Sequence, residues 1–375
     1  MGLFGKKQEN APGLIGVDIG AGGMKAIECQ MYDGHLRLAT YGYSQMKHPE
    51  NQQGSLLDDP KKGAEVLTRI IKESGMKAHR ANASLPSQHV FHAMITIPQP
   101  KDVKQDLKPL IETQVKKLLP IPLEKMILDS TVIDKHLLPT AEQEPAEKKP
   151  DMGIGGREPQ KQIRVLVSGA PKDLVQKYLE IFKIAKIELV ALETEAFALI
   201  RSLVGKEKGR VMIVDIGFER TNITIINEGI PYLHRSVKAG GGIITQMLAK
   251  QAGVSIQDAE QMKTDLAFSP GGEIPGVLRD AMMPILHEIR YSIELYSAQD
   301  FHDHQGVEKI ILTGGSAHLP HIDPFLTEAL NLNVYIGDPW ARMSVPAGMR
   351  SILDEIGPRF SVAVGLAMKL QPDKK

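Results

Sequence analysis

A short pattern that occurs twice constrains the fold of this chain more than any other feature. The stretch GVDIGAGGMK, residues 16–25, and the stretch IVDIGFERTN, residues 213–222, each place an aspartate at the end of an apolar run. A turn and a second apolar run follow each aspartate, so both stretches predict a β-hairpin whose first strand is buried. The two hairpins predict a duplicated core. Alternating strand and helix patterns throughout the chain place it in the α/β class.

The residues of these turns suit the binding of phosphate and metal. Gly20, Gly22 and Gly23 carry no Cβ, so the backbone N–H groups of the first turn can approach a phosphate closely. Lys25 adds a positive charge beside that turn. An aspartate at a strand end beside phosphates is suited to holding Mg²⁺. Two facing turns of this kind predict a clamp on the phosphates of a nucleotide, although a single such hairpin is also compatible with an ordinary turn.

A third motif strengthens the prediction of a nucleotide site. The stretch LTGGS, residues 312–316, follows a buried strand and offers bare backbone against which a nucleoside can lie. The order of the three motifs along the chain is much harder to obtain by chance than any one of them alone.

Composition and charge exclude several classes of function. The chain has 45 basic and 45 acidic residues, so it lacks the net positive charge that broad nucleic-acid binding requires. Its one cysteine, Cys29, cannot form an internal disulfide, which favours a reducing compartment. No segment has the roughly 20 continuous apolar residues of a membrane helix, and the N-terminus lacks the apolar region of a signal peptide. We therefore expect a soluble, cytoplasmic protein.

The three motifs together resemble the actin-like ATPase superfold that actin and sugar kinases share. The resemblance implies two duplicated lobes around a nucleotide cleft, with an extra small domain inserted in the first lobe. It also implies that ATP or ADP binds with Mg²⁺ and that Asp18 and Asp215 lie beside the metal. The cofactor-binding residues that it implies are Asp18, Gly20, Ala21, Gly22, Gly23, Lys25, Asp215, Gly217, Thr221, Gly240, Gly241, Gly242, Glu260, Lys263, Gly314, Gly315 and Ser316. Glu195 falls on the helix that often carries the residue orienting the attacking water, and Gly365 matches a small residue of an interdomain helix.

Three longer stretches narrow the resemblance within this superfold: PKDLVQKYLEIFKIAKIELVALETEAFAL, AGGGIITQMLAKQAGVSIQDAEQMK and ILTGGSAHLPHI. They resemble the PilM family of type IV pilus assembly. It implies an ATP-binding scaffold at the cytoplasmic face of the inner membrane, with slow or no ATP hydrolysis. Its partners would be the N-terminal cytoplasmic peptide of the inner-membrane protein PilN and other pilus assembly proteins. Membrane association would then come only through partners, and the resemblance allows self-association. A filament-forming protein of the bacterial actin or FtsA type and a small-molecule kinase are alternatives on the same fold.

The resemblance and the composition together predict the domain boundaries. They assign 1–13 to an N-terminal tip, 14–42 with 163–205 to the first lobe, 43–136 to the inserted domain, 137–162 to a flexible loop, and 206–375 to the second lobe. The chain departs from the family pattern in the second turn. Phe218, Glu219 and Arg220 stand there in place of the small or hydroxyl residues that are commoner, so the first turn is the stronger candidate for phosphate binding.

Overall fold

The computed structural model describes residues 13–44, 55–100, 102, 106–134, 162–266, 274–298 and 306–370. The chain divides into two compact units, residues 1–87 with 177–375 and residues 88–176. The tip and loop expected from the sequence lie outside the described residues, apart from Gly13 and Gln162. No helix in the described ranges is long and apolar enough to cross a membrane.

The first unit contains two five-stranded sheets of the same design. Strand orders are β3-β2-β1-β4-β8 in one sheet and β11-β10-β9-β12-β13 in the other. In both sheets the first three strands are antiparallel neighbours and the last two are added in parallel. The strands of the first sheet are β1 (Leu14–Gly20), β2 (Gly23–Tyr32), β3 (His35–Tyr43), β4 (Arg80–Leu85) and β8 (Glu188–Thr194). Those of the second are β9 (Val211–Ile216), β10 (Thr221–Asn227), β11 (Ile230–Val237), β12 (Lys309–Thr313) and β13 (Asn333–Ile336). The duplicated core predicted from the two hairpins is present, and each hairpin forms the centre of one sheet.

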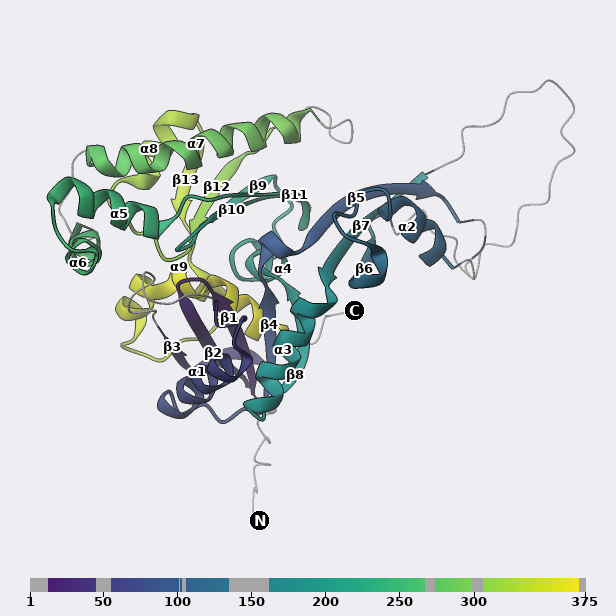
Figure 1. Ribbon diagram of the computed structural model, residues 1–375, viewed down its shortest axis with the longest axis horizontal. Helices are drawn as coiled ribbons and strands as arrows, with labels where there is room; N and C mark the ends of the chain where they lie inside the picture. The colour runs from purple at the N-terminus through teal and green to yellow at the C-terminus, as the bar shows by residue number, and fades with distance from the viewer. Residues whose placement is uncertain are drawn as a thin grey trace, which may run out of the picture. The chain divides into compact units, whose positions relative to one another are not determined.

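The helices of this unit cover the sheets and join them. They are α1 (Pro60–Glu73), α3 (Lys172–Ile184, which begins in the other unit), α4 (Glu195–Leu199), α5 (Gly241–Ala252), α6 (Ile256–Leu266), α7 (Gly276–Ser297), α8 (Ile322–Leu330) and α9 (Arg350–Ala367). Helix α9 packs against both β1 and β12, so one helix contributes to the cores of both sheets (Figure 1). The helix that the apolar spacing predicts over 61–74 is α1, which begins after an Asp59 N-cap that accepts a hydrogen bond from the Lys62 N–H at 3.2 Å.

Helices lie on both faces of the first sheet, and its glycines show how closely they pack. A Cβ on Gly16 would lie 2.1 Å from the carbonyl oxygen of Ala363 in α9, whereas one on Gly42 would lie 3.0 Å from Ile70 Cγ2 in α1. Because both faces are covered, β1 reads as a continuous apolar run rather than as an alternation of apolar and polar residues.

The second unit is a three-stranded antiparallel sheet of order β5-β7-β6 with α2 packed on it. Its elements are β5 (Phe91–Pro98), α2 (Lys108–Val115), β6 (Met126–Val132) and β7 (Gln162–Pro171). The sequence predicts a longer helix over 103–118, of which 103–105 lie outside the described residues.

This unit differs in extent from the inserted domain expected over 43–136. Helix α1 and β4 belong to the first unit, where β4 lies between β1 and β8. Strand β7 belongs to the second unit, although the sequence assigns 163–205 to the first lobe. The pairing of β4 with β1 and of β7 with β5 joins segments far apart in the chain. Local apolar patterns carry no information about such pairing.

Candidate functional site

The first turn holds a buried aspartate beside a lysine. Asp18 and Lys25 are cross-strand partners in the β1–β2 hairpin, so both side chains project from the same face. Lys25 Nζ lies 3.2 Å from Asp18 Oδ2, and the Ser84 hydroxyl donates to Asp18 Oδ1 at 3.2 Å. Ala21 and Gly22 form the turn. Gly23 has φ of 126°, a conformation that favours glycine.

The second aspartate lies against the glycine pair that follows β12. Asp215 is the last but one residue of β9 and pairs with Thr313 in the parallel β12. A Cβ on Gly314 would lie 2.4 Å from Asp215 Oδ1, and Gly314 has φ of 93°, so only glycine fits there. The second turn closes through a hydrogen bond from the Gly217 N–H to the Arg220 carbonyl at 3.0 Å, and the Thr221 hydroxyl donates to the Ala239 carbonyl at 2.7 Å.

The three glycines at the start of α5 pack on this second turn. A Cβ on Gly240 would lie 2.7 Å from the Gly217 carbonyl oxygen. The N–H groups of Gly241 and Gly242 donate to the carbonyls of Gly217 and Phe218 at 2.9 and 2.8 Å. These two N–H groups are therefore engaged within the protein, and the glycines serve close packing of the α5 N-terminus against the turn.

Glu260 and Lys263 form a polar group beside the same glycines. Lys263 Nζ donates to Glu260 Oε2 at 2.6 Å, to the Thr245 hydroxyl at 2.8 Å and to the Gly241 carbonyl at 3.2 Å. Burial lowers the pKa of Lys263. A Cβ on Gly241 would lie 2.5 Å from Ser316 Oγ and 3.5 Å from Lys263 Nζ. Residues from α5, α6 and the segment after β12 thus meet at one place, as the nucleoside side of the predicted site requires.

Glu195 joins the two aspartates in a group of carboxylates. It begins α4 and accepts hydrogen bonds at Oε2 from the Ser87 N–H at 3.1 Å, the Ser87 hydroxyl at 2.5 Å and Asn222 Nδ2 at 3.2 Å. Burial, followed by the charges of Asp18 and Asp215, raises the pKa of Glu195 to about 8. Burial and the charge of Asp18 raise the pKa of Asp215 to about 6, while Lys25 acts in the opposite direction.

This group of side chains fits a divalent cation bound together with phosphate. Mutual repulsion of the carboxylates is what a bound cation relieves. Asn222 Oδ1 and Thr194 Oγ1 are buried without a hydrogen-bond partner in the described structure, and both adjoin residues of this group. Among the described residues, no three His, Cys, Asp or Glu side chains are placed to hold a metal by themselves. Mg²⁺ in nucleotide sites ordinarily takes one or two carboxylates and completes its shell with phosphate and water.

Glu195→Gln should change how stability depends on pH. Because the pKa of Glu195 rises from 4.5 to about 8 on folding, the folded state keeps a proton that the unfolded state has released across this window. Wild-type stability therefore falls as pH rises through the window, and the glutamine variant lacks that loss. We measure the free energy of unfolding in urea, without metal or nucleotide. The difference between the variant and wild type should grow in favour of the variant by about 1 kcal/mol or more from about pH 5 to about pH 9. The same comparison on the exposed Glu65→Gln should show no such gain, and a flat difference for Glu195→Gln would contradict the assignment.

Arg359 lies beside the candidate site and was not predicted from the sequence. It follows Pro358 in α9. The Pro358 carbonyl accepts a hydrogen bond from the Gly314 N–H at 3.0 Å. Arg359 Nε lies 3.8 Å from the position of a Cβ on Gly315, and its guanidinium lies 5.9 Å from the centre of the Tyr43 ring. Its charge also contributes to the lowered pKa of Lys263. The sequence contains no signal for this placement, because it depends on where α9 crosses the end of β12.

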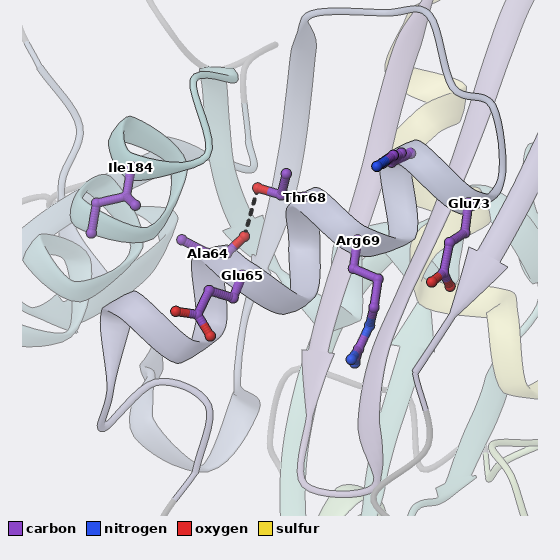
Figure 2. Close-up of a pocket in the computed structure, with 7 residues that line it drawn as sticks. Ala64, Glu65, Thr68, Arg69, Glu73 and Ile184 are labelled. Carbon is purple, nitrogen blue, oxygen red and sulfur yellow. Dashed lines mark hydrogen bonds between the residues drawn. The ribbon is translucent and has the colours of Figure 1, made fainter.

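A shallow hollow of about 440 Å³ lies elsewhere, along α1 (Figure 2). The residues that line it are Ala64, Glu65, Thr68, Arg69, Lys72, Glu73 and Ile184. None of the predicted site residues is among them, and its two acidic and two basic side chains balance in charge.

Comparison with known proteins assigns the family. The family model for the type IV pilus assembly protein PilM matches residues 16–149 and 150–371. The chain belongs to the PilM family. This confirms the resemblance that the sequence motifs indicated.

Solved structures support the fold. The chain is similar to a chain of the PilM-PilN type IV pilus biogenesis complex, with a TM-score of 0.77 and 22% identity, covering 96% of this chain and 99% of that one. It is also similar to the ethanolamine utilization protein EutJ from Carboxydothermus hydrogenoformans, with a TM-score of 0.52 and 16% identity over 96% and 90% of the two chains. The actin-like ATPase fold predicted for this PilM-family chain is confirmed.

A curated relative matches part of the chain. The cell division protein FtsA of Rhizobium meliloti (strain 1021) is 27% identical over 176 residues, which cover 41% of this chain and 38% of that protein. The match spans well under half of the relative's length, so it carries no functional conclusion for the PilM-family chain.

Proposed function

We propose that this chain is a nucleotide-binding scaffold of type IV pilus assembly that binds the N-terminal cytoplasmic peptide of PilN. The observation that carries the proposal is the match of the PilM family model to nearly the whole chain, residues 16–149 and 150–371. A family-wide match of this extent spans both sheets and the small second unit, so the proposal concerns the whole protein rather than one shared motif.

The nucleotide part of the proposal rests on the geometry of the site. ATP or ADP would lie with its phosphates at Gly20 and Lys25 and its nucleoside at Gly314–Ser316, beside Glu260, Lys263 and Arg359. Asp18 and Asp215 would hold Mg²⁺, which offsets the charge of the phosphates. The amides and cations of the chain would orient the ligand. We expect hydrolysis to be slow, with the nucleotide acting as a structural ligand.

The partner part of the proposal draws on the solved PilM-PilN complex, to which this chain is similar over almost its full length. PilN is an inner-membrane protein with a short cytoplasmic N-terminus by the family resemblance. Capture of that peptide would place the chain at the cytoplasmic face of the inner membrane.

A peptide-binding measurement tests the partner directly. A fluorescein-labelled peptide with the N-terminal cytoplasmic sequence of the PilN from the same genome is titrated with the full chain, and anisotropy is recorded. We expect saturable binding with a dissociation constant in roughly the micromolar range, as is usual for short peptides that order on binding. A scrambled peptide of the same composition is the control. Equal binding of the two peptides would remove the partner from the proposal.

A further inference from the structure

Arg359 brings a positive charge to the candidate site that no carboxylate of the described residues pairs. The two lysines of the site are both neutralised, Lys25 by Asp18 at 3.2 Å and Lys263 by Glu260 at 2.6 Å. Neither a hydrogen bond nor an ion pair joins the Arg359 guanidinium to any residue in the described part of the chain. Arg359 is half-buried, and burial makes an unpaired charge costly. The site therefore has room for one anionic group beside this guanidinium.

The Gly315 backbone supplies a second free donor beside Arg359. Gly315 is exposed, whereas its neighbours Gly314 and Ser316 are buried. The N–H groups of both neighbours donate to backbone carbonyls, at 3.0 and 3.2 Å, but the Gly315 N–H is bonded to none of the residues that the structure describes. Arg359 Nε lies 3.8 Å from the position of a Cβ on Gly315. A guanidinium and a backbone N–H are thus available at the same place.

Pro358 fixes α9, and with it Arg359, against the end of β12. A proline inside a helix has no N–H to donate to the carbonyl four residues earlier, which here is that of Asp354. His318, in the segment after β12, donates from Nε2 to this carbonyl at 3.2 Å. The Pro358 carbonyl in turn accepts a hydrogen bond from the Thr313 hydroxyl at 3.0 Å. Arg359 is therefore held at a fixed place beside the glycine pair.

The contacts of Arg359 place it between the two ends of the candidate site. Its guanidinium lies 5.9 Å from the centre of the Tyr43 ring. Tyr43 and Lys25 are cross-strand partners in β3 and β2, so both side chains project from the same face as the first turn's lysine. At the other end, the charge of Arg359 adds to burial in lowering the pKa of Lys263. In a nucleotide, the group between the phosphate end and the nucleoside end is the phosphate bonded to the ribose.

We infer that Arg359 and the Gly315 N–H bind the phosphate that is bonded to the ribose of a nucleotide. The guanidinium presents parallel N–H donors that match two phosphate oxygens, and the phosphate supplies the negative charge that this cation lacks. A base stacked on the guanidinium would leave its charge unpaired. The inference rests on the proposed function, because it presupposes that the site holds a nucleotide.

The test measures the dissociation constants of the full chain for ADP and for adenosine by isothermal titration calorimetry. Arg359→Gln should raise the constant for ADP about tenfold or more and leave that for adenosine unchanged, because only ADP carries the phosphate. Arg359→Lys keeps the charge but not the planar donors, and should weaken ADP binding less than the glutamine variant does. The loss should be the same with Mg²⁺ and with a chelator, since the guanidinium contacts the phosphate directly.

Arg37→Gln is the matched control. The Arg37 guanidinium also lies near a tyrosine ring, 5.6 Å from the centre of Tyr32, but it is exposed on the β2–β3 hairpin and touches no residue of the candidate site. Its replacement should leave both dissociation constants as in wild type. Circular dichroism of each variant verifies that the chain is folded.

The outcomes separate this inference from the proposed function. Equal weakening of ADP and adenosine by Arg359→Gln would show that the side chain contacts the nucleoside, and would overturn the inference. An unchanged dissociation constant for ADP would overturn it too, while nucleotide binding would stand. If neither wild type nor any variant binds ADP, with or without Mg²⁺, the proposed nucleotide function itself fails.

Discussion

Gly365→Ala is expected to lower the free energy of unfolding by about 3 kcal/mol or more. An alanine Cβ at this position would lie 1.9 Å from the carbonyl oxygen of Ala198 and 2.5 Å from its carbonyl carbon. Both atoms are backbone atoms of α4, so no side-chain rotation can relieve the clash, and α4 must move away from α9. The Arg201 guanidinium also donates to the Gly365 carbonyl, and that hydrogen bond is disturbed by the same movement.

Helix propensity alone predicts the opposite sign for this change. Alanine is favoured over glycine in a helix interior by about 1 kcal/mol, so an unconstrained position would gain stability. Gly276→Ala at the start of α7 is the matched control, because a Cβ there meets nothing within 4 Å. Urea unfolding followed by circular dichroism distinguishes the two cases. A Gly365→Ala chain as stable as wild type would show that α4 and α9 are not held at this distance.

Asp18→Asn is expected to abolish the part of nucleotide stabilisation that depends on Mg²⁺. Asp18 is 7% exposed, is paired with Lys25 and raises the pKa of Asp215 through its charge, so it is central to the carboxylate group. Asparagine keeps the size and an acceptor for Ser84 but removes the charge that a cation needs. At about 100 times its dissociation constant a ligand adds roughly 2.7 kcal/mol of stability. We expect the variant to lose most of the Mg²⁺-dependent share of that amount.

Thermal unfolding of the full chain with ADP, in the presence of Mg²⁺ or of a chelator, provides the measurement. Asp33→Asn makes the same chemical change in the exposed turn between β2 and β3 and should leave the Mg²⁺-dependent shift intact. If Asp18→Asn retained the full Mg²⁺-dependent shift, the metal would lie elsewhere in the chain.

The sequence alone was sufficient for the features that depend on local pattern. Residues 16–25 and 213–222 form hairpins because apolar runs, turn residues and strand propensity agree within each segment. The fold class and the family follow from motifs of this kind, and both predictions are confirmed. One nucleotide site formed by Asp18, Asp215 and the glycine motifs stays a prediction. The structure places these residues near one another, and the variants described above test the assignment.

Tertiary structure alone decided the features that depend on distant segments meeting. The place of β4 beside β1, the approach of Arg359 to Gly315 and the contact of Phe218 with Gly22 and Gly242 each join segments with no local signal for one another. Gly242 and Gly20 both lie in glycine-rich motifs, but the structure places them differently. The Gly242 N–H group donates a hydrogen bond to the Phe218 carbonyl, whereas Gly20 lies beside Lys25. Residue type and local spacing therefore determine which chemistry a strand end and its turn can offer. The packing of distant backbone segments against one another determines which N–H groups and side chains of those turns remain available to bind a ligand.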